Sequence, residues 1–117
     1  MKLSKAQQEV LNEAKARIDY ARKHDFYDWY RNGYSWFRDK SNEAIDEWLA
    51  KNDATEHKIG GTEYATKHYE MNKAGIDYLC HASSLTIRKL ESLGLIEIIK
   101  DSAGEYYGFD VIKIVNY

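Results

Sequence analysis

Residues 83–99 read SSLTIRKLESLGLIEII, and this stretch decides the fold of the C-terminal part of the chain. Ser83 is a residue type that caps helix N-termini. Apolar residues then recur at the spacing of one helical face: Ile87, Leu90 and Leu93. Gly94 is suited to the left-handed position that ends such a helix, and residues 95–99 read as an apolar strand. The stretch therefore predicts a capped amphipathic helix that leads directly into a strand.

A second strand is expected after the turn at residues 101–104, which read DSAG. Its apolar and aromatic residues are Tyr106, Tyr107, Phe109, Val111, Ile112, Ile114 and Val115. Two strands joined by a tight turn predict a C-terminal β-hairpin. Residues 75–81 also look extended, with Ile76, Tyr78 and Cys80 alternating against Asp77 and His81.

The N-terminal segment predicts a helix from about Lys5 to Lys23. Ser4 followed by Gln7 fits a capping box, in which each side chain bonds the backbone of the other residue. Small and apolar residues then line one face at spacings of three or four: Ala6, Val10, Ala14, Ile18 and Ala21. This face predicts an amphipathic helix packed on a core.

Residues 25–74 form an aromatic-rich insertion that we expect to be largely helical. Between residues 26 and 37 seven of twelve positions are aromatic, and Asn32-Gly33 marks a turn. Ser41 is a candidate N-cap for a helix with this apolar face: Ala44, Ile45, Trp48 and Leu49. Residues 62–73 fit either a helix or a strand, and the sequence does not decide between them.

The composition of the chain indicates one domain of the α+β class. Its 117 residues suffice for a single core, and a hydrophobic content of 44% excludes a disordered chain. We divide the domain into an N-terminal helix (1–24), the insertion (25–74) and a helix with hairpin (75–117). Cys80 is the only cysteine and no apolar run is long enough to span a bilayer, so a cytoplasmic protein without a membrane partner is expected.

The segment Ser84–Val115 resembles winged helix-turn-helix proteins, through Leu90, the Gly94-Leu95-Ile96 step and the Tyr106-Tyr107 strand. Residues 3–11, taken with 93–99, look similar to small uncharacterised proteins of Gram-positive phages and prophages. The first resemblance implies a winged-helix-like fold and a regulator that binds double-stranded DNA. It assigns groove or phosphate contact to Ser84, Arg88 and Lys89, and a position at the base of the wing to Lys100. A homodimer is expected because one helix reads little sequence.

The charge pattern weakens the inference that a domain with this fold binds DNA. DNA-binding domains normally carry a basic face, but the net charge here is −2 and residues 75–117 hold more acidic than basic groups. The basic wing tip typical of the family has no match, since Asp101 and Glu105 stand there. Arg88 and Lys89 are equally compatible with the solvated face of a structural helix, so both interpretations stay open.

The aromatic run has three interpretations: core packing, a protein interface, or stacking on unpaired bases. We prefer an interface for the aromatic residues that the core does not take. The candidates are Tyr27, Trp29, Tyr30, Tyr34 and Trp36. The alternative function is therefore a small phage or mobile-element protein that binds and modulates a host protein, or a second copy of itself, through this surface.

Catalysis finds little support in the sequence. His57, His68, His81 and Cys80 match no paired zinc-ligand spacing. Cys80 and His81 are neighbours and would face opposite sides of a strand, so they are a poor nucleophile and base pair. We expect no enzyme, no metal site and no cofactor.

Overall fold

The computed structural model describes residues 2–55, 60–100 and 110–117, which form five α-helices, one 3-10 turn and a three-stranded sheet. In chain order the elements are α1 (Lys5–Lys23), α2 (Phe26–Gly33), η1 (Ser35–Phe37), α3 (Asn42–Asp53), α4 (Thr62–Lys73), β1 (Ile76–Cys80), α5 (Ser84–Ser92), β2 (Ile96–Lys100) and β3 (Asp110–Ile114). The predicted α+β class, mainly helical with a C-terminal β-hairpin, is confirmed. Residues 62–73, left open by the sequence, are a helix.

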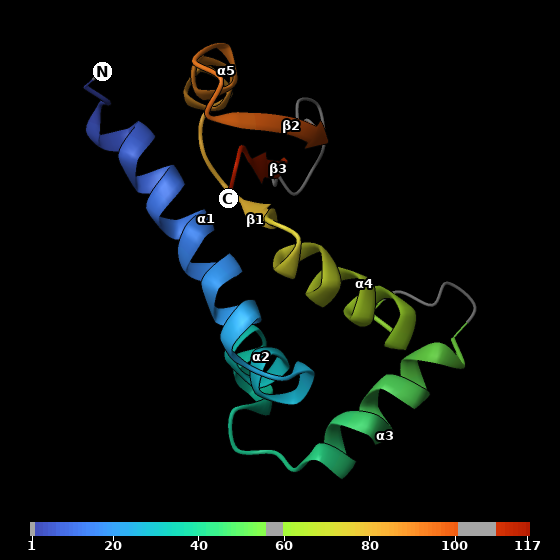
Figure 1. Cartoon of the computed structure of the whole chain (residues 1–117). Coiled ribbons are helices and arrows are strands. Elements are labelled where there is room, and N and C mark those ends of the chain that lie inside the picture. Colours follow the sequence, from blue (N-terminus) through green and yellow to red (C-terminus); the bar gives the residue numbers. More distant parts are fainter. Residues whose placement is uncertain (1, 56–59, 101–109) are drawn as a thin grey trace.

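Helix α1 connects the two ends of the molecule. It begins with the predicted capping box, because the Ser4 side chain accepts from the Gln7 backbone N–H at 3.2 Å and Gln7 returns the bond at 2.9 Å. Its 19 residues make a rod about 28 Å long. The sheet and α5 lie at one end of this rod, and α2 lies at the other (Figure 1). The first turns therefore pack on one core and the last turn packs on another.

The first core lies between α1, α5 and the sheet. Its buried residues are Val10, Leu11, Ala14, Ile18, Cys80, Ile87, Leu90, Ile96, Ile112 and Ile114. The strand order is β1-β3-β2, and β3 pairs antiparallel with both neighbours. β3 occupies the centre, which explains why nearly all of its residues are buried. Tyr106, Tyr107 and Phe109, which the sequence placed in the second strand, lie outside the described residues.

The second core is built from the aromatic insertion. Its buried residues are Ala21, Trp29, Tyr30, Phe37, Ile45, Leu49, Ala65 and Tyr69. Trp29 and Tyr30, which the sequence offered as interface candidates if the core did not take them, are only 5% and 3% exposed and belong to this core. One face of the short helix α2 packs on α4, so the rings on that face point inward. Large rings bury the most apolar area in such a contact.

The connection between β1 and α5 bears on the winged-helix resemblance. α5 has Ser83 as its N-cap and Leu93 as its C-cap, and it is followed by Gly94, whose φ of +75° is the left-handed conformation expected there. The element before α5 is strand β1, which is joined to it by residues 81–83. α5 therefore follows a strand, where a helix-turn-helix unit would place another helix.

A partly buried ion pair connects α1 to β1. Arg17 donates from Nε and Nη2 to the two carboxylate oxygens of Asp77, both at 2.8 Å. The sequence placed Asp77 on the opposite face of β1 from the apolar residues. In the structure Asp77 is nevertheless fully buried. The carboxylate is tolerated there because Arg17 and the Leu79 backbone N–H, at 3.2 Å, satisfy it.

We expect Arg17→Met to lower the free energy of unfolding by about 3 kcal/mol, because it leaves the Asp77 charge buried without a partner. Adding Asp77→Asn should recover more than half of this loss, since the amide keeps an acceptor for Leu79 without a charge. Urea unfolding followed by circular dichroism measures both. The control is Arg22→Met on the same helix, where an exposed Nε bonds the Lys73 carbonyl. Equal losses for the two arginine variants would contradict a special role for the pair.

Candidate functional site

The outer face of α5 carries the residues that the winged-helix resemblance assigned to DNA. Ile87 and Leu90 point into the core, and the opposite side presents Ser84, Arg88 and Lys89, all exposed. Leu85 belongs to the same face and is 83% exposed. Helix α5 also lies at one end of the molecule (Figure 1). The face is therefore a surface with two cations, a hydroxyl and an apolar side chain.

Glu91, the acidic residue of α5, has a structural role. One of its carboxylate oxygens accepts from the Ile98 backbone N–H at 2.8 Å. β2 is an edge strand of the sheet, so this bond closes part of an otherwise open edge. The carboxylate is directed to β2, which reduces its opposition to an anion bound at Arg88 and Lys89. Lys100, the last residue of β2, is exposed, and the turn that follows it lies outside the described residues.

Acidic groups lie beside the start of α5. A groove of about 310 Å³ runs between α1 and the N-cap of α5. It is lined by Ala6, Glu9, Val10, Glu13, His81, Ala82, Ser83 and Thr86. A helix N-terminus attracts phosphate, but two carboxylates at this one oppose it. A phosphate is therefore better placed farther along α5, at Arg88 and Lys89.

The basic residues of α1 do not simply extend this face. Lys15 and Arg22 both lie over the ring of Tyr117, with distances of 5.1 Å from Nζ and 5.2 Å from Cζ to the ring centroid. Arg17 is held by Asp77. Burial alone would lower the pKa of Arg17, but the hydrogen bond and the charge of Asp77 outweigh it and raise that pKa. These cations gather around β1 and the C-terminus.

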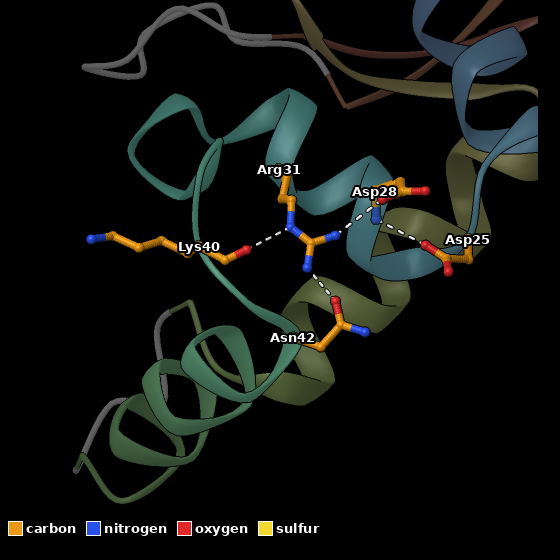
Figure 2. Close-up of polar contacts among 5 residues, drawn as sticks. All are labelled: Asp25, Asp28, Arg31, Lys40 and Asn42. Atoms are coloured by element: carbon orange, nitrogen blue, oxygen red, sulfur yellow. Dashed lines mark hydrogen bonds and ion pairs between the residues drawn. The ribbon is translucent and has the colours of Figure 1, made fainter.

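Arg31 organises the turn that follows α2 (Figure 2). Its Nε donates to the Lys40 carbonyl at 2.8 Å and its Nη1 donates to Asp28 at 3.0 Å. Its Nη2 donates to the side-chain oxygen of Asn42. One guanidinium thus fixes the end of α2, the chain before α3 and the first residue of α3. The turn between them, which includes η1, is held at both ends.

Trp36 is the aromatic residue that this turn presents outward. Its side chain is 75% exposed, and the Lys40 ammonium lies 5.4 Å from the ring centroid. Tyr27 and Tyr34 are half-buried, with Tyr27 donating to Asp46 at 2.7 Å and Tyr34 stacked on Tyr30. Of the five aromatic residues proposed for an interface, Trp36 alone has a largely exposed side chain.

Cys80 and His81 lie as the sequence predicted. Cys80 is buried and His81 is exposed. Burial, with Asp77 and Asp110 nearby, raises the pKa of the Cys80 thiol to about 12, so the thiol stays protonated. Within the three described ranges, no group of three His, Cys, Asp or Glu side chains is placed to hold a metal ion.

His68 is a buried residue of α4 for which the sequence indicated no metal-ligand role. It is 5% exposed and packs against the rings of Trp29 and Tyr78, at centroid distances of 4.9 and 4.8 Å. Its Nδ1 has no hydrogen-bond partner among the described residues. Burial lowers the pKa of His68 to about 4, and the Arg17 charge adds to the lowering while Asp77 opposes it. The ring is therefore neutral at pH 7.

Two sequence signals could have pointed to these polar residues. Asp77 interrupts an otherwise apolar strand, and a buried carboxylate needs a cation, so an arginine next to the apolar face of α1 was a reasonable partner. Arg31 lies within the aromatic run between two potential acceptors, Asp28 and Asn42. His68 shares one face of a helix over residues 62–73 with Ala65 and Tyr69, but the sequence does not show which rings of other elements surround it.

Comparison of the chain with family models, with curated proteins and with solved structures gives no significant match. None of the helices in the described part of the chain has both the length and the apolar character needed to cross a membrane.

We expect acid to destabilise the protein through His68. The folded-state pKa of about 4 lies below the usual value of 6.5, so the unfolded chain binds the proton more tightly. The stability that depends on neutral His68 is complete above pH 6.5 and is lost as the pH falls towards 4. The loss is at most about 3 kcal/mol. Between pH 6.5 and 4 the unfolding free energy of the wild type should therefore fall more steeply than that of His68→Leu, which has no group to protonate. Parallel curves would contradict the assignment.

Proposed function

We propose that this protein is a phage-type, winged-helix-like regulator that binds double-stranded DNA with the outer face of α5. The observation that carries the proposal is the exposure of Ser84, Arg88 and Lys89 on one face of a capped helix at the end of the molecule. Arginine and lysine reach guanine O6 and N7 or phosphate oxygens, and a serine hydroxyl bonds phosphate. Lys100 on the neighbouring edge strand supplies a further phosphate contact. A cytoplasmic setting is part of this proposal.

The α5 face suits a protein that binds DNA as a dimer. The helix has only nine residues, and a helix of this length contacts a few base pairs in the major groove. Two copies related by a two-fold axis would read two half-sites about one helical turn apart. Because the net charge is −2, non-specific affinity should be low and binding should depend on the local α5 face.

The test measures binding of duplex DNA by fluorescence anisotropy over a salt series, with duplexes enriched by repeated selection from a random pool. We expect Arg88→Ala with Lys89→Ala to abolish detectable binding and, where any remains, to reduce the salt slope by about two. The control is Lys51→Ala with Lys67→Ala, two exposed lysines on α3 and α4 that give the same charge change. Equal weakening by both pairs, or no enrichment of any duplex, would overturn the proposal.

A second arm uses the acidic groove beside α5. Glu9→Gln with Glu13→Gln removes two carboxylates near the N-cap, so it should strengthen DNA binding if phosphates approach this end of α5. An unchanged affinity, together with loss in the Arg88 and Lys89 variant, would place the duplex farther along the helix.

A second candidate function rests on Trp36. Tryptophan is enriched among residues that dominate protein interfaces, and a side chain held in place before binding loses less conformational entropy. The Arg31 bonds hold the turn, and 75% of Trp36 is exposed, so it meets both conditions. In this alternative the chain binds and modulates a host protein, with Trp36 entering an apolar pocket of that partner.

This alternative is tested with a photo-crosslinking amino acid at the exposed position 35, which leaves Trp36 in place, followed by identification and purification of the crosslinked protein. Trp36→Ala should weaken its directly measured affinity at least tenfold, about the effect of a hot-spot residue. The matched control is Leu85→Ala, which removes another highly exposed apolar side chain, on α5 at the far end of α1. A partner that depends on Leu85 and not on Trp36 would reject the turn as the interface.

A further inference from the structure

A small cavity lies where the two cores meet. It has a volume of about 100 Å³ and is bordered by α1, α2, α4 and β1. Its lining residues are Arg17, Tyr20, Trp29, Asn32, Gly33, Tyr34, His68, Asn72 and Leu79. Asn32 and Gly33 are exposed and Leu79 is 40% exposed, so the rim reaches the surface. We call this space the junction cavity.

The polar groups of the junction cavity are fixed in place and retain hydrogen-bonding capacity. Arg17 uses Nε and Nη2 for Asp77, and its Nη1 makes no hydrogen bond to any described residue. The His68 imidazole likewise makes none within the described ranges; its Nδ1 is sealed from solvent, so Nε2 is the nitrogen left for a ligand in the cavity. Asn72 is held in place when its amide is oriented to donate to the Ile76 carbonyl at 2.8 Å and accept from Trp29 Nε1 at 3.1 Å. A guanidinium and an imidazole therefore remain for a ligand.

The walls are aromatic and rigid. Trp29 packs edge-on against both His68 and Tyr34, and Tyr34 stacks on Tyr30 with ring centroids 4.5 Å apart. Tyr20 stacks on His24 at 3.9 Å. Ligand pockets combine mostly apolar walls with a few placed polar groups, and this composition matches that pattern. Aromatic walls favour a flat ring.

The charges around the cavity favour a neutral ligand over an anion. The positive charge of Arg17 is already balanced by Asp77 at 2.8 Å, and Glu13 lies near enough to act on the same guanidinium. His68 contributes no charge at neutral pH. A carboxylate ligand would thus gain little net attraction and would lose its hydration.

We propose that the junction cavity binds a small, neutral, planar ring that carries a carbonyl next to a ring N–H group. Arg17 Nη1 donates to the carbonyl oxygen, and the imidazole of His68 accepts from the ring N–H. The ring lies among Tyr20, Trp29 and Tyr34. This site is separate from the α5 face and does not depend on DNA binding.

The test uses 2-pyridone as the probe, with toluene as an apolar ring of similar size and benzoate as an anionic one. Amide correlation NMR spectra of the full chain are recorded during titration of each compound. We expect 2-pyridone to bind at millimolar concentration or below, to shift the amide signals of Asn32 and Gly33, and to bind at least about tenfold more tightly than either comparator.

Two variants locate the site and its polar recognition. Gly33→Leu adds a side chain at the rim, where a Cβ meets nothing within 4 Å, so the fold should persist while 2-pyridone binding falls. His68→Leu keeps a similar volume without the imidazole, so it should lose the preference for 2-pyridone over toluene. Equal binding of toluene, tighter binding of benzoate, shifts that persist in Gly33→Leu, or no shift with any probe would overturn the proposal. The last outcome would leave a cavity filled only by water.

Discussion

The ion pair between Arg17 and Asp77 sets the relative position of the two halves of this molecule. Asp77 is fully buried, and removal of a carboxylate from water costs several kcal/mol unless it is paired and hydrogen-bonded. Arg17 meets this requirement with two bonds of 2.8 Å from the middle of α1. The residues of α1 before and including Ile18 pack on the sheet core, and Ala21 packs on the aromatic core. The pair thus lies at the transition between two cores that share one helix, and the junction cavity is beside it.

Further hydrogen bonds between side chains and backbone groups lie outward from the ion pair. Asn72 at the end of α4 donates to the Ile76 carbonyl, and Asp77 accepts from the Leu79 N–H, so side chains satisfy backbone groups along β1. Glu91 does the same for β2 at Ile98. Both outer strands of the sheet therefore have backbone groups that bond to nearby side chains, which disfavours pairing with another strand. For this reason the helical faces and the Trp36 turn are better candidates for contact with partners than the sheet edges.

The elements that local rules control could be predicted from the sequence. Ser4 with Gln7, Ser41, Ser83 and Gly94 each act within a few residues of their own position, and the structure places all of them at helix ends as predicted. The burial of Trp29 and Tyr30 could not be predicted, because a run of seven aromatic residues does not show which rings meet another element. Asp77 and His68 were missed for the same reason. Their environments come from side chains distant in the sequence, and no spacing rule connects Arg17 to Asp77 across sixty positions.

The net charge of the chain disfavours DNA binding, whereas the cations of the α5 face favour it. Which effect a bound phosphate experiences depends on its distance from each charged group. At physiological salt, exposed charges more than about 8 Å apart are largely screened from one another. A phosphate on α5 therefore responds mainly to Arg88, Lys89 and the closest acids, and hardly to the acidic residues of α3 and α4. Among those closest acids, Glu91 is directed to the backbone of β2, while Glu9 and Glu13 border the start of the helix. Among the described residues, the middle of α5 is thus less unfavourable for a phosphate than its N-terminus. A duplex that avoids the helix start and lies along Arg88 and Lys89 is the docking geometry that these charges favour.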